Sequence, residues 1–248
     1  MQKNILITGR PGSGKSTLVK KLIENIPQRV GFVTSEILED EKRVGFEVET
    51  HQQLKATVAH VDFKTSARLS ERSKFFIDMS NLESLIPEVS EFRVDDFLYL
   101  DEIGQMQLLS HQFQQLVTRY LDSENTCLAT LSSVFEDDFI KSIKERTDVI
   151  IVEISAETRE ETEKFVVQLL RKIEKAKQYI SEPHRFTQKG SNIELESEHG
   201  TRTLSSIDDQ WICDCDFFRE YNICSHTIAV QELVSPSSHS LLHSNPTL

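Results

Sequence analysis

The stretch that decides the fold is Gly9-Arg10-Pro11-Gly12-Ser13-Gly14-Lys15-Ser16, followed by Thr17. It fits the pattern G-x-x-x-x-G-K-[ST], in which a glycine-rich loop leads from a strand into a helix. The apolar run Ile5-Leu6-Ile7 precedes it, and residues 16–26 carry apolar side chains at helical spacing. Backbone N–H groups of such a loop surround phosphates at a helix N-terminus. Residues 9–17 are therefore predicted to bind a nucleotide, with Lys15 on the β- and γ-phosphates.

Two acidic residues follow the apolar run Phe97-Leu98-Tyr99-Leu100. Ligands bind beyond the carboxyl ends of the strands in open α/β sheets, so Asp101 and Glu102 should lie beside the loop. We expect Ser16 and Asp101 to hold Mg²⁺, and Glu102 to orient a water molecule for attack on the γ-phosphate. Lys15 and Glu102 are then the catalytic residues, and ATP or GTP is the expected substrate.

This carboxylate favours hydrolysis, because no arginine-rich segment typical of a phosphotransferase lid is evident in the sequence. A nucleoside or polynucleotide kinase stays open as an alternative. A nucleotide-gated adaptor, which binds a protein or nucleic acid through its C-terminal region, is the second alternative.

Strand and helix patterns alternate along the first three quarters of the chain, which predicts an α/β fold with a mostly parallel sheet flanked by helices. The expected strands are residues 5–7, 30–34, 44–49, 57–63, 75–77, 97–100, 127–131 and 149–152. The expected helices are residues 16–26, 82–89, 106–121, 138–145 and 157–179.

Four blocks resemble the thermophilic-type, or cancer-related, nucleoside triphosphatases. They are residues 8–17, Gly31-Phe32-Val33-Thr34-Ser35-Glu36-Ile37, Arg43-Val44-Gly45-Phe46-Glu47-Val48 and Leu100-Asp101-Glu102-Ile103-Gly104-Gln105-Met106. The resemblance covers residues 1 to about 170. It implies slow, Mg²⁺-dependent hydrolysis of several nucleoside triphosphates on a RecA-like sheet. Leu38 stands where that family usually has an arginine, which places substrate range in question.

Other polar residues near these motifs allow two interpretations each. Thr130, Ser132 and Ser133 follow a predicted core strand, and they are either γ-phosphate sensors or surface turn residues. Arg159 is expected to form an ion pair with Glu163, four residues later on one helix face, rather than to contact the nucleotide.

A separate cluster lies near the C-terminus, where Cys213 and Cys215 are followed by Cys224 and His226. Residues i and i+2 of a strand point the same way, so Cys213 and Cys215 should present both thiolates to one side. Three cysteines and one histidine form a complete tetrahedral set for structural Zn²⁺, with no open position for catalysis. Cys127, in a predicted buried strand, is expected to be an inert core thiol.

The spacing C-x-C…C-x-H resembles the SWIM zinc finger. We therefore expect a P-loop nucleoside-triphosphatase domain over residues 1–180, a SWIM-like zinc finger over residues 184–235 and a disordered tail over residues 236–248. The finger includes a hairpin made from residues 193–198 and 201–204. SWIM fingers are associated with binding DNA or protein.

Charge bears on the partner and on the compartment. The formal net charge is −12, and from residue 184 onward four Lys and Arg residues face nine Asp and Glu residues. Such a surface repels nucleic-acid phosphates, which favours a protein partner for the finger.

No apolar run reaches the ~18 residues of a membrane span, and no signal peptide is evident at the start. A cytoplasmic location is expected.

Overall fold

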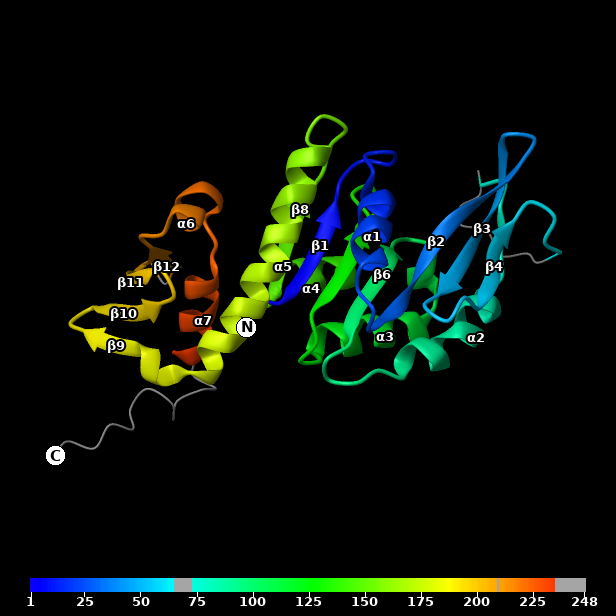
Figure 1. Ribbon diagram of the computed structural model, residues 1–248. Helices are drawn as coiled ribbons and strands as arrows, with labels where there is room; N and C mark the ends of the chain where they lie inside the picture. The colour runs from blue at the N-terminus through cyan, green and yellow to red at the C-terminus, as the bar shows by residue number, and fades with distance from the viewer. Residues whose placement is uncertain (65–72, 209, 235–248) are drawn as a thin grey trace. The chain divides into compact units, whose positions relative to one another are not determined.

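The computed structural model describes residues 1–64, 73–208 and 210–234 (Figure 1). The predicted tail over residues 236–248 lies outside these ranges. The chain divides into two compact units. The first unit is Lys3–Glu163; the second combines Met1–Gln2 with the chain from Lys164 onward.

An eight-stranded sheet forms the centre of the first unit, in the order β5-β4-β3-β2-β6-β7-β1-β8. Its strands are β1 (Asn4–Thr8), β2 (Arg29–Glu39), β3 (Lys42–Thr50), β4 (Lys55–His60), β5 (Phe76–Ile77), β6 (Phe97–Ile103), β7 (Cys127–Leu131) and β8 (Val149–Glu153). Five neighbouring strands, β2, β6, β7, β1 and β8, pair in parallel. The strands β3, β4 and β5 extend the sheet beyond β2 in antiparallel fashion. The predicted α/β fold with a mostly parallel sheet is confirmed.

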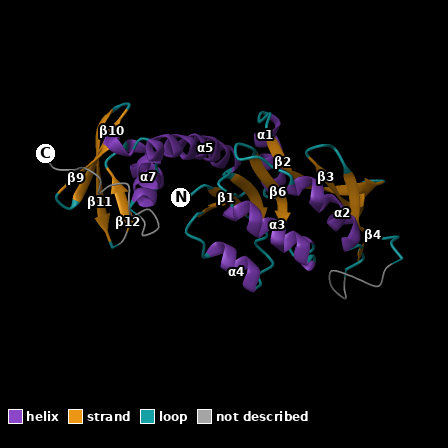
Figure 2. Cartoon of the chain, turned by 90° about the horizontal axis from the view of Figure 1, so that it is seen from below, coloured by secondary structure: helices purple, strands orange, loops and turns teal. Residues whose placement is uncertain are grey.

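Helices cover both faces of this sheet, with α1 on one face and α2, α3 and α4 on the other (Figure 2). Their bounds are α1 (Lys15–Glu24), α2 (Met79–Ser90), the 3₁₀ turn η1 (Gln107–Leu109), α3 (His111–Asp122) and α4 (Asp138–Lys144). The largest fully buried side chains include Phe32 on β2 and Phe113 and Tyr120 on α3. The apolar faces of these helices thus pack against the continuous apolar runs of the strands.

Two elements differ most from their predicted bounds. β2 has eleven residues where five were expected, because its outer half, residues 35–39, pairs only with β3 and has no continuous apolar run. The single helix predicted over residues 106–121 is divided at Ser110, whose hydroxyl accepts a hydrogen bond from the Phe113 N–H at 3.2 Å and caps α3. A local capping residue overrides the continuous apolar pattern there.

The second unit is built on a four-stranded antiparallel sheet in the order β12-β11-β10-β9. Its elements are β9 (Phe186–Lys189), β10 (Asn192–Ser197), β11 (Gly200–Ile207), β12 (Gln210–Cys213), the 3₁₀ turn η2 (Pro183–Arg185), α6 (Asp216–Tyr221) and α7 (Ser225–Leu233). The predicted hairpin corresponds to β10 and β11, whereas β9 and α6 were not predicted. Helix α5 (Arg159–Ser181) begins in the first unit and continues in the second.

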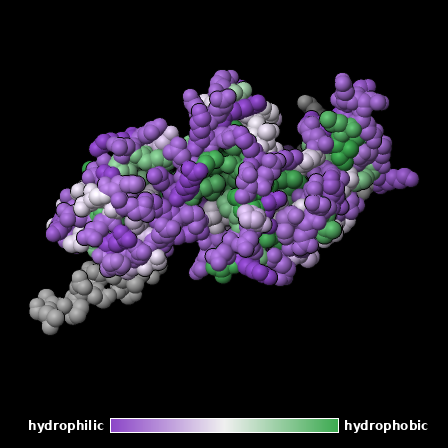
Figure 3. Space-filling view, viewed as in Figure 1, coloured by the Kyte–Doolittle hydropathy of each residue, from purple (hydrophilic) through white to green (hydrophobic). Residues whose placement is uncertain are grey.

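The surface is mainly hydrophilic on the face shown in Figure 3, with several hydrophobic areas between the charged side chains. Leu38, on β2, is 60% exposed. Within the described ranges, no helix is both long enough and apolar enough to cross a membrane.

Candidate active site and metal centre

The glycine-rich loop joins β1 to α1, as the sequence predicts. Gly14 is the residue before the helix and has φ of 103°, a left-handed conformation that a residue with a side chain adopts only with strain. Lys15 folds back over the loop and donates hydrogen bonds to the carbonyl oxygens of Gly9 at 2.8 Å and Arg10 at 3.4 Å. The predicted phosphate-binding residues Gly9, Arg10, Pro11, Gly12, Ser13, Gly14, Lys15, Ser16 and Thr17 thus form one continuous loop and first helical turn.

Asp101 lies beside Ser16, although the two are 85 residues apart. The Ser16 hydroxyl donates to Asp101 Oδ1 at 2.9 Å, and the Thr130 hydroxyl donates to the same oxygen at 2.7 Å. Asp101 is fully buried within the second half of β6, which extends past it to Ile103, and its second oxygen, Oδ2, accepts no hydrogen bond from the described residues. Burial raises the pKa of Asp101, which the two hydroxyls partly oppose. A buried carboxylate oxygen without a partner, next to a serine hydroxyl, fits Mg²⁺ or one of its water ligands.

Glu102 occupies the next position and packs against Gly104. A Cβ atom at Gly104 would lie 3.2 Å from Glu102 Oε1, so a glycine leaves room for this carboxylate. Burial raises the pKa of Glu102, and the positive charge of Lys15 opposes that rise. The charge of Lys15, the predicted phosphate-binding lysine, therefore acts on this carboxylate.

Polar residues at the end of β7 and directly after it contact Asp101 or the loop. Thr130 is fully buried on Asp101, and the Ser133 hydroxyl donates to the Gly9 carbonyl oxygen at 2.9 Å. Ser132 accepts a hydrogen bond from the Phe135 N–H at 3.3 Å and shapes the turn. Thr130 is therefore a buried strand residue and not a surface turn residue, whereas Ser132 and Ser133 lie in the turn after β7.

The expected Arg159–Glu163 ion pair is wrong. Arg159 Nε donates to the Ser13 carbonyl oxygen at 2.7 Å, and its Nη2 donates to the Gly12 carbonyl oxygen at 2.6 Å. Glu163 pairs instead with Lys21 Nζ at 2.5 Å. Helical spacing makes a local pair possible, but the loop carbonyls lie within reach of the start of α5 and fix the guanidinium by two hydrogen bonds.

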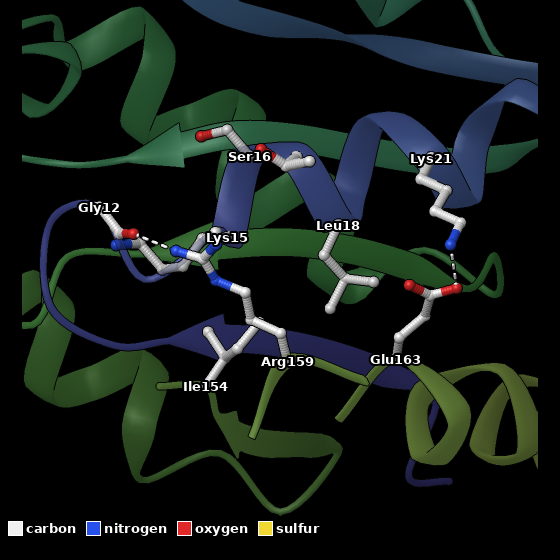
Figure 4. A pocket seen from close by; sticks show the side chains of 10 residues that line it. Gly12, Lys15, Ser16, Leu18, Lys21, Ile154, Arg159 and Glu163 are labelled. Carbon is white, nitrogen blue, oxygen red and sulfur yellow. Dashed lines mark hydrogen bonds and ion pairs between the residues drawn. The ribbon is translucent and has the colours of Figure 1, made fainter. Parts of the chain in front are cut away.

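A cavity of about 300 Å³ opens between α1 and the start of α5 (Figure 4). Its lining comprises Gly12, Gly14, Lys15, Ser16, Thr17, Leu18, Lys21, Ile154, Arg159 and Glu163. Neither Asp101 nor Glu102 belongs to this lining. The loop therefore has two sides, one facing the carboxylates and one facing the cavity.

The C-terminal cluster is a separate site in the second unit. The candidate ligand atoms of Cys213, Cys215, Cys224 and His226 all lie within 4.8 Å of one another, and all four residues are buried. His226 Nδ1 lies 3.4 Å from Cys213 Sγ and 3.7 Å from Cys224 Sγ. Ligands of tetrahedral zinc are separated by roughly 3.5–3.8 Å, given Zn–S and Zn–N bonds of about 2.3 and 2.0 Å. The donor set and its spacing fit Zn²⁺.

Different elements position these four ligands. Cys213 ends β12, Cys215 precedes α6, and Cys224 precedes α7, which contains His226 in its first turn. The prediction that Cys213 and Cys215 lie in one strand is wrong, because the strand ends between them. Cys224 Sγ accepts a hydrogen bond from the Thr227 N–H at 3.4 Å, an outer contact of the kind that stabilises thiolate ligands. Cys127 lies apart from the cluster in the first unit, where burial raises its pKa to about 12.

Comparison with solved structures identifies the same fold elsewhere. The crystal structure of THEP1 from Aquifex aeolicus is 28% identical, superimposes with a TM-score of 0.59, and covers 67% of this chain and 98% of its own. The solution structure of a human cancer-related nucleoside triphosphatase, at 24% identity and a TM-score of 0.56, shares the fold.

Sequence comparison gives the family. A nucleoside-triphosphatase THEP1 from Thermotoga sp. (strain RQ2) is 38% identical over 157 residues, which are 62% of this chain and 88% of that protein. Its counterpart in Thermotoga petrophila is 35% identical over 169 residues, covering 67% and 92%. A family model with the description NTPase matches residues 4–167, which include the loop, Asp101 and Glu102. This chain belongs to that NTPase family.

Proposed function

We propose that this protein hydrolyses nucleoside 5′-triphosphates such as ATP and GTP to the diphosphate and phosphate, with Mg²⁺. The observation that carries the proposal is the hydrogen bond from the Ser16 hydroxyl, in the glycine-rich loop and next to Lys15, to the buried carboxylate of Asp101, which Glu102 follows. Family membership supports the reaction class, since the relatives above are named nucleoside triphosphatases.

Each residue has a separate task in this proposal. Lys15 exchanges its carbonyl partners for the β- and γ-phosphate oxygens, and the loop N–H groups neutralise further phosphate charge. Ser16 and Asp101 hold Mg²⁺, which, when bound, offsets the negative charge that develops on the phosphates. Glu102 accepts a hydrogen bond from the attacking water and orients it toward the γ-phosphorus.

The second unit is proposed to be a SWIM-like zinc module over residues 184–235 that contacts a protein partner, joined to a P-loop domain over residues 1–180. The Cys₃His set supports the metal, and the acidic balance from residue 184 onward favours a protein over nucleic acid. A cytoplasmic location suits a cluster of thiols that must stay reduced to bind metal.

The test is phosphate release from ATP and GTP by Lys15→Ala and Glu102→Gln. We expect Lys15→Ala to lose both binding and turnover. Glu102→Gln should keep nucleotide binding and lose at least a hundredfold in turnover, because general-base catalysis contributes about that factor. Glu124→Gln, a change at an exposed carboxylate elsewhere, is the matched control. Full turnover by Glu102→Gln would exclude this residue as the base.

The same assay separates the alternatives. Faster transfer of phosphate to an added nucleoside than to water would indicate a kinase. Tight nucleotide binding with negligible turnover would instead favour a nucleotide-gated adaptor.

A further inference from the structure

The cavity between α1 and the start of α5 is not explained by the chemistry of phosphate hydrolysis alone. In the proposed function, the γ-phosphate lies beside Ser16 and Glu102, on the carboxylate side of the loop. A triphosphate chain that begins there and passes Lys15 leads into the cavity, because Lys15, Ser16 and Thr17 belong to its lining. The cavity extends from Gly12 and Gly14 to Lys21 (Figure 4).

The walls of this cavity have the composition of a nucleoside site. Leu18 and Ile154 are buried apolar side chains that line it, and the guanidinium of Arg159 lines it as well. Binding sites for small molecules combine apolar walls with a few placed polar groups in this way. A volume of about 300 Å³ is at the lower end of the usual range for such sites.

Arg159 is held in a fixed plane. Its two hydrogen bonds to the Gly12 and Ser13 carbonyls orient the guanidinium, which lies over Gly14: a Cβ atom at Gly14 would be 3.0 Å from Arg159 Nε and 3.5 Å from its Cζ. A planar, immobilised guanidinium is a good stacking partner for an aromatic ring. A lysine in its place would keep the charge but not the plane.

The ion pair between Lys21 and Glu163 closes the far end of the cavity. Lys21 Nζ lies 2.5 Å from Glu163 Oε1, and the side chains are 61% and 32% exposed. A pair this exposed is weak, so either partner can turn to a ligand. The ammonium can donate to a keto oxygen of a base, and the carboxylate can accept from an amino group.

We propose that this cavity is the nucleoside subsite of the enzyme, in which Arg159 stacks on the base and the Lys21–Glu163 pair contacts the edge of the base. The inference rests on the proposed nucleoside-triphosphatase function. The Glu163 carboxylate can accept from the amino group of adenine, and the Lys21 ammonium can donate to the keto oxygen of guanine. We therefore expect the subsite to bind both bases.

Binding measurements test this subsite without reference to turnover. ADP and pyrophosphate, each with Mg²⁺, are titrated calorimetrically into the full-length wild-type protein and into Arg159→Ala, Arg159→Lys and Arg171→Ala. Arg171 is an exposed arginine on the same helix outside the cavity and is the matched control. We expect Arg159→Ala and Arg159→Lys to weaken ADP binding about tenfold, from loss of stacking, and pyrophosphate binding less than twofold.

The comparison of the two ligands distinguishes stacking from support of the loop. Equal weakening of ADP and pyrophosphate would mean that Arg159 only holds the loop, and it would overturn the proposal. Unchanged ADP binding in both Arg159 variants would overturn it too. If the wild-type protein binds pyrophosphate as tightly as ADP, the nucleoside subsite is contradicted but the proposed function is not. If it binds neither ligand, the proposed function is contradicted as well.

The base edge is tested with ADP, GDP, CDP and UDP. Glu163→Gln should change the order of affinity among the four by several-fold, because a carboxylate only accepts hydrogen bonds whereas the amide also donates them. Glu160→Gln, at an exposed carboxylate in the first turn of the same helix, should leave the order as it is. A uniform change across the four ligands would show that Glu163 does not contact the base.

Discussion

Thr130 shows how one hydroxyl group supports the active site without reaching the substrate. It is fully buried and donates to Asp101 Oδ1 at 2.7 Å, so in the proposed function it leaves Oδ2 of that carboxylate for Mg²⁺. Thr130 is thus a positioning residue.

Replacement of Thr130 by valine keeps the shape and removes this hydrogen bond. We expect the Mg²⁺ concentration for half-maximal phosphate release to rise about tenfold, because hydrogen bonds to charged groups are worth roughly 1.5–3 kcal/mol. Thr118→Val, at an exposed hydroxyl on α3 that donates to the Gln114 carbonyl, should leave the Mg²⁺ titration as it is. An unchanged titration in Thr130→Val would contradict the positioning role.

Residues of the site differ in how far the sequence predicts them. The roles of Lys15, Ser16, Asp101 and Glu102 depend on fixed spacing within a motif and on the end of a strand, and both are visible in the sequence. The partner of Arg159 is not visible, because it lies 146 positions earlier in the chain and is brought close only by the sheet. Local spacing suggests Glu163 instead, which the structure pairs with Lys21.

At the scale of elements, Asp148 ties the start of β8 to the start of β1. Its backbone carbonyl accepts from the N–H groups of Lys3 and Asn4, and its carboxylate accepts two hydrogen bonds from Arg146, each 2.8 Å long. Arg146 also pairs with Asp122 at the end of α3, at 2.8 Å. One arginine and one aspartate therefore join three elements at the amino end of the parallel strands.

This arrangement predicts a dependence of stability on pH. Burial alone would raise the pKa of Asp148, but the hydrogen bonds and charge of Arg146 outweigh it and lower the pKa. A folded-state pKa below the unfolded value stabilises the protein above the unfolded pKa of about 3.9, and the gain is lost as the pH falls through the folded pKa.

Asp148→Asn should accordingly lower the free energy of unfolding by about 1 kcal/mol at pH 7, and the difference from wild type should shrink toward pH 3. Urea unfolding at both values measures it, with Glu124→Gln as an exposed control. A loss of the same size at pH 3 would mean that the asparagine disturbs packing rather than charge.

Elements were predictable where the apolar pattern is strong and unpredictable where it is not. The central strands β1, β6, β7 and β8 are continuous apolar runs, and the sequence locates each within two or three residues. The outer half of β2 lacks a continuous apolar run and is a strand because β3 pairs with it. The hydrophobic pattern of one segment does not show which strand will pair with it. In the second unit, α6 is a six-residue helix between Cys215 and Cys224 of the cluster, and a helix this short is not predicted from its own propensity.

At the scale of the whole molecule, the Cys₃His cluster suggests that the two units differ in what stabilises them. The first unit has a large apolar core, whereas the four strands and short helices of the second surround the cluster. Trp211, the only tryptophan of the chain, lies on β12 two residues before Cys213, so its fluorescence reports on the second unit.

Chelation of the metal should therefore change the Trp211 fluorescence and leave ADP binding in the first unit largely intact, because zinc binding supplies the folding free energy of small metal-stapled modules. Metal analysis should give about one zinc per chain in the wild type and in Cys127→Ser, and none in Cys224→Ser. Trp211 fluorescence that does not change on chelation, or zinc retained by Cys224→Ser, would contradict the proposed zinc site.

Helix α5 is one continuous helix that belongs to both units. It has 23 residues without glycine or proline, and the division between the units falls after its fifth residue, Glu163. Isolated helices shorter than ~12 residues are marginal in water, so the five residues that carry Arg159 and Glu163 cannot keep their helical form alone. They rely on the turns that follow, where Phe165 stacks on Tyr221 at 4.6 Å and Lys175 pairs with Glu198 at 2.7 Å. One wall of the cavity in the first unit thus takes its rigidity from residues that fold with the second, and a chain shortened after Glu163 would lose that wall together with the module it was meant to remove.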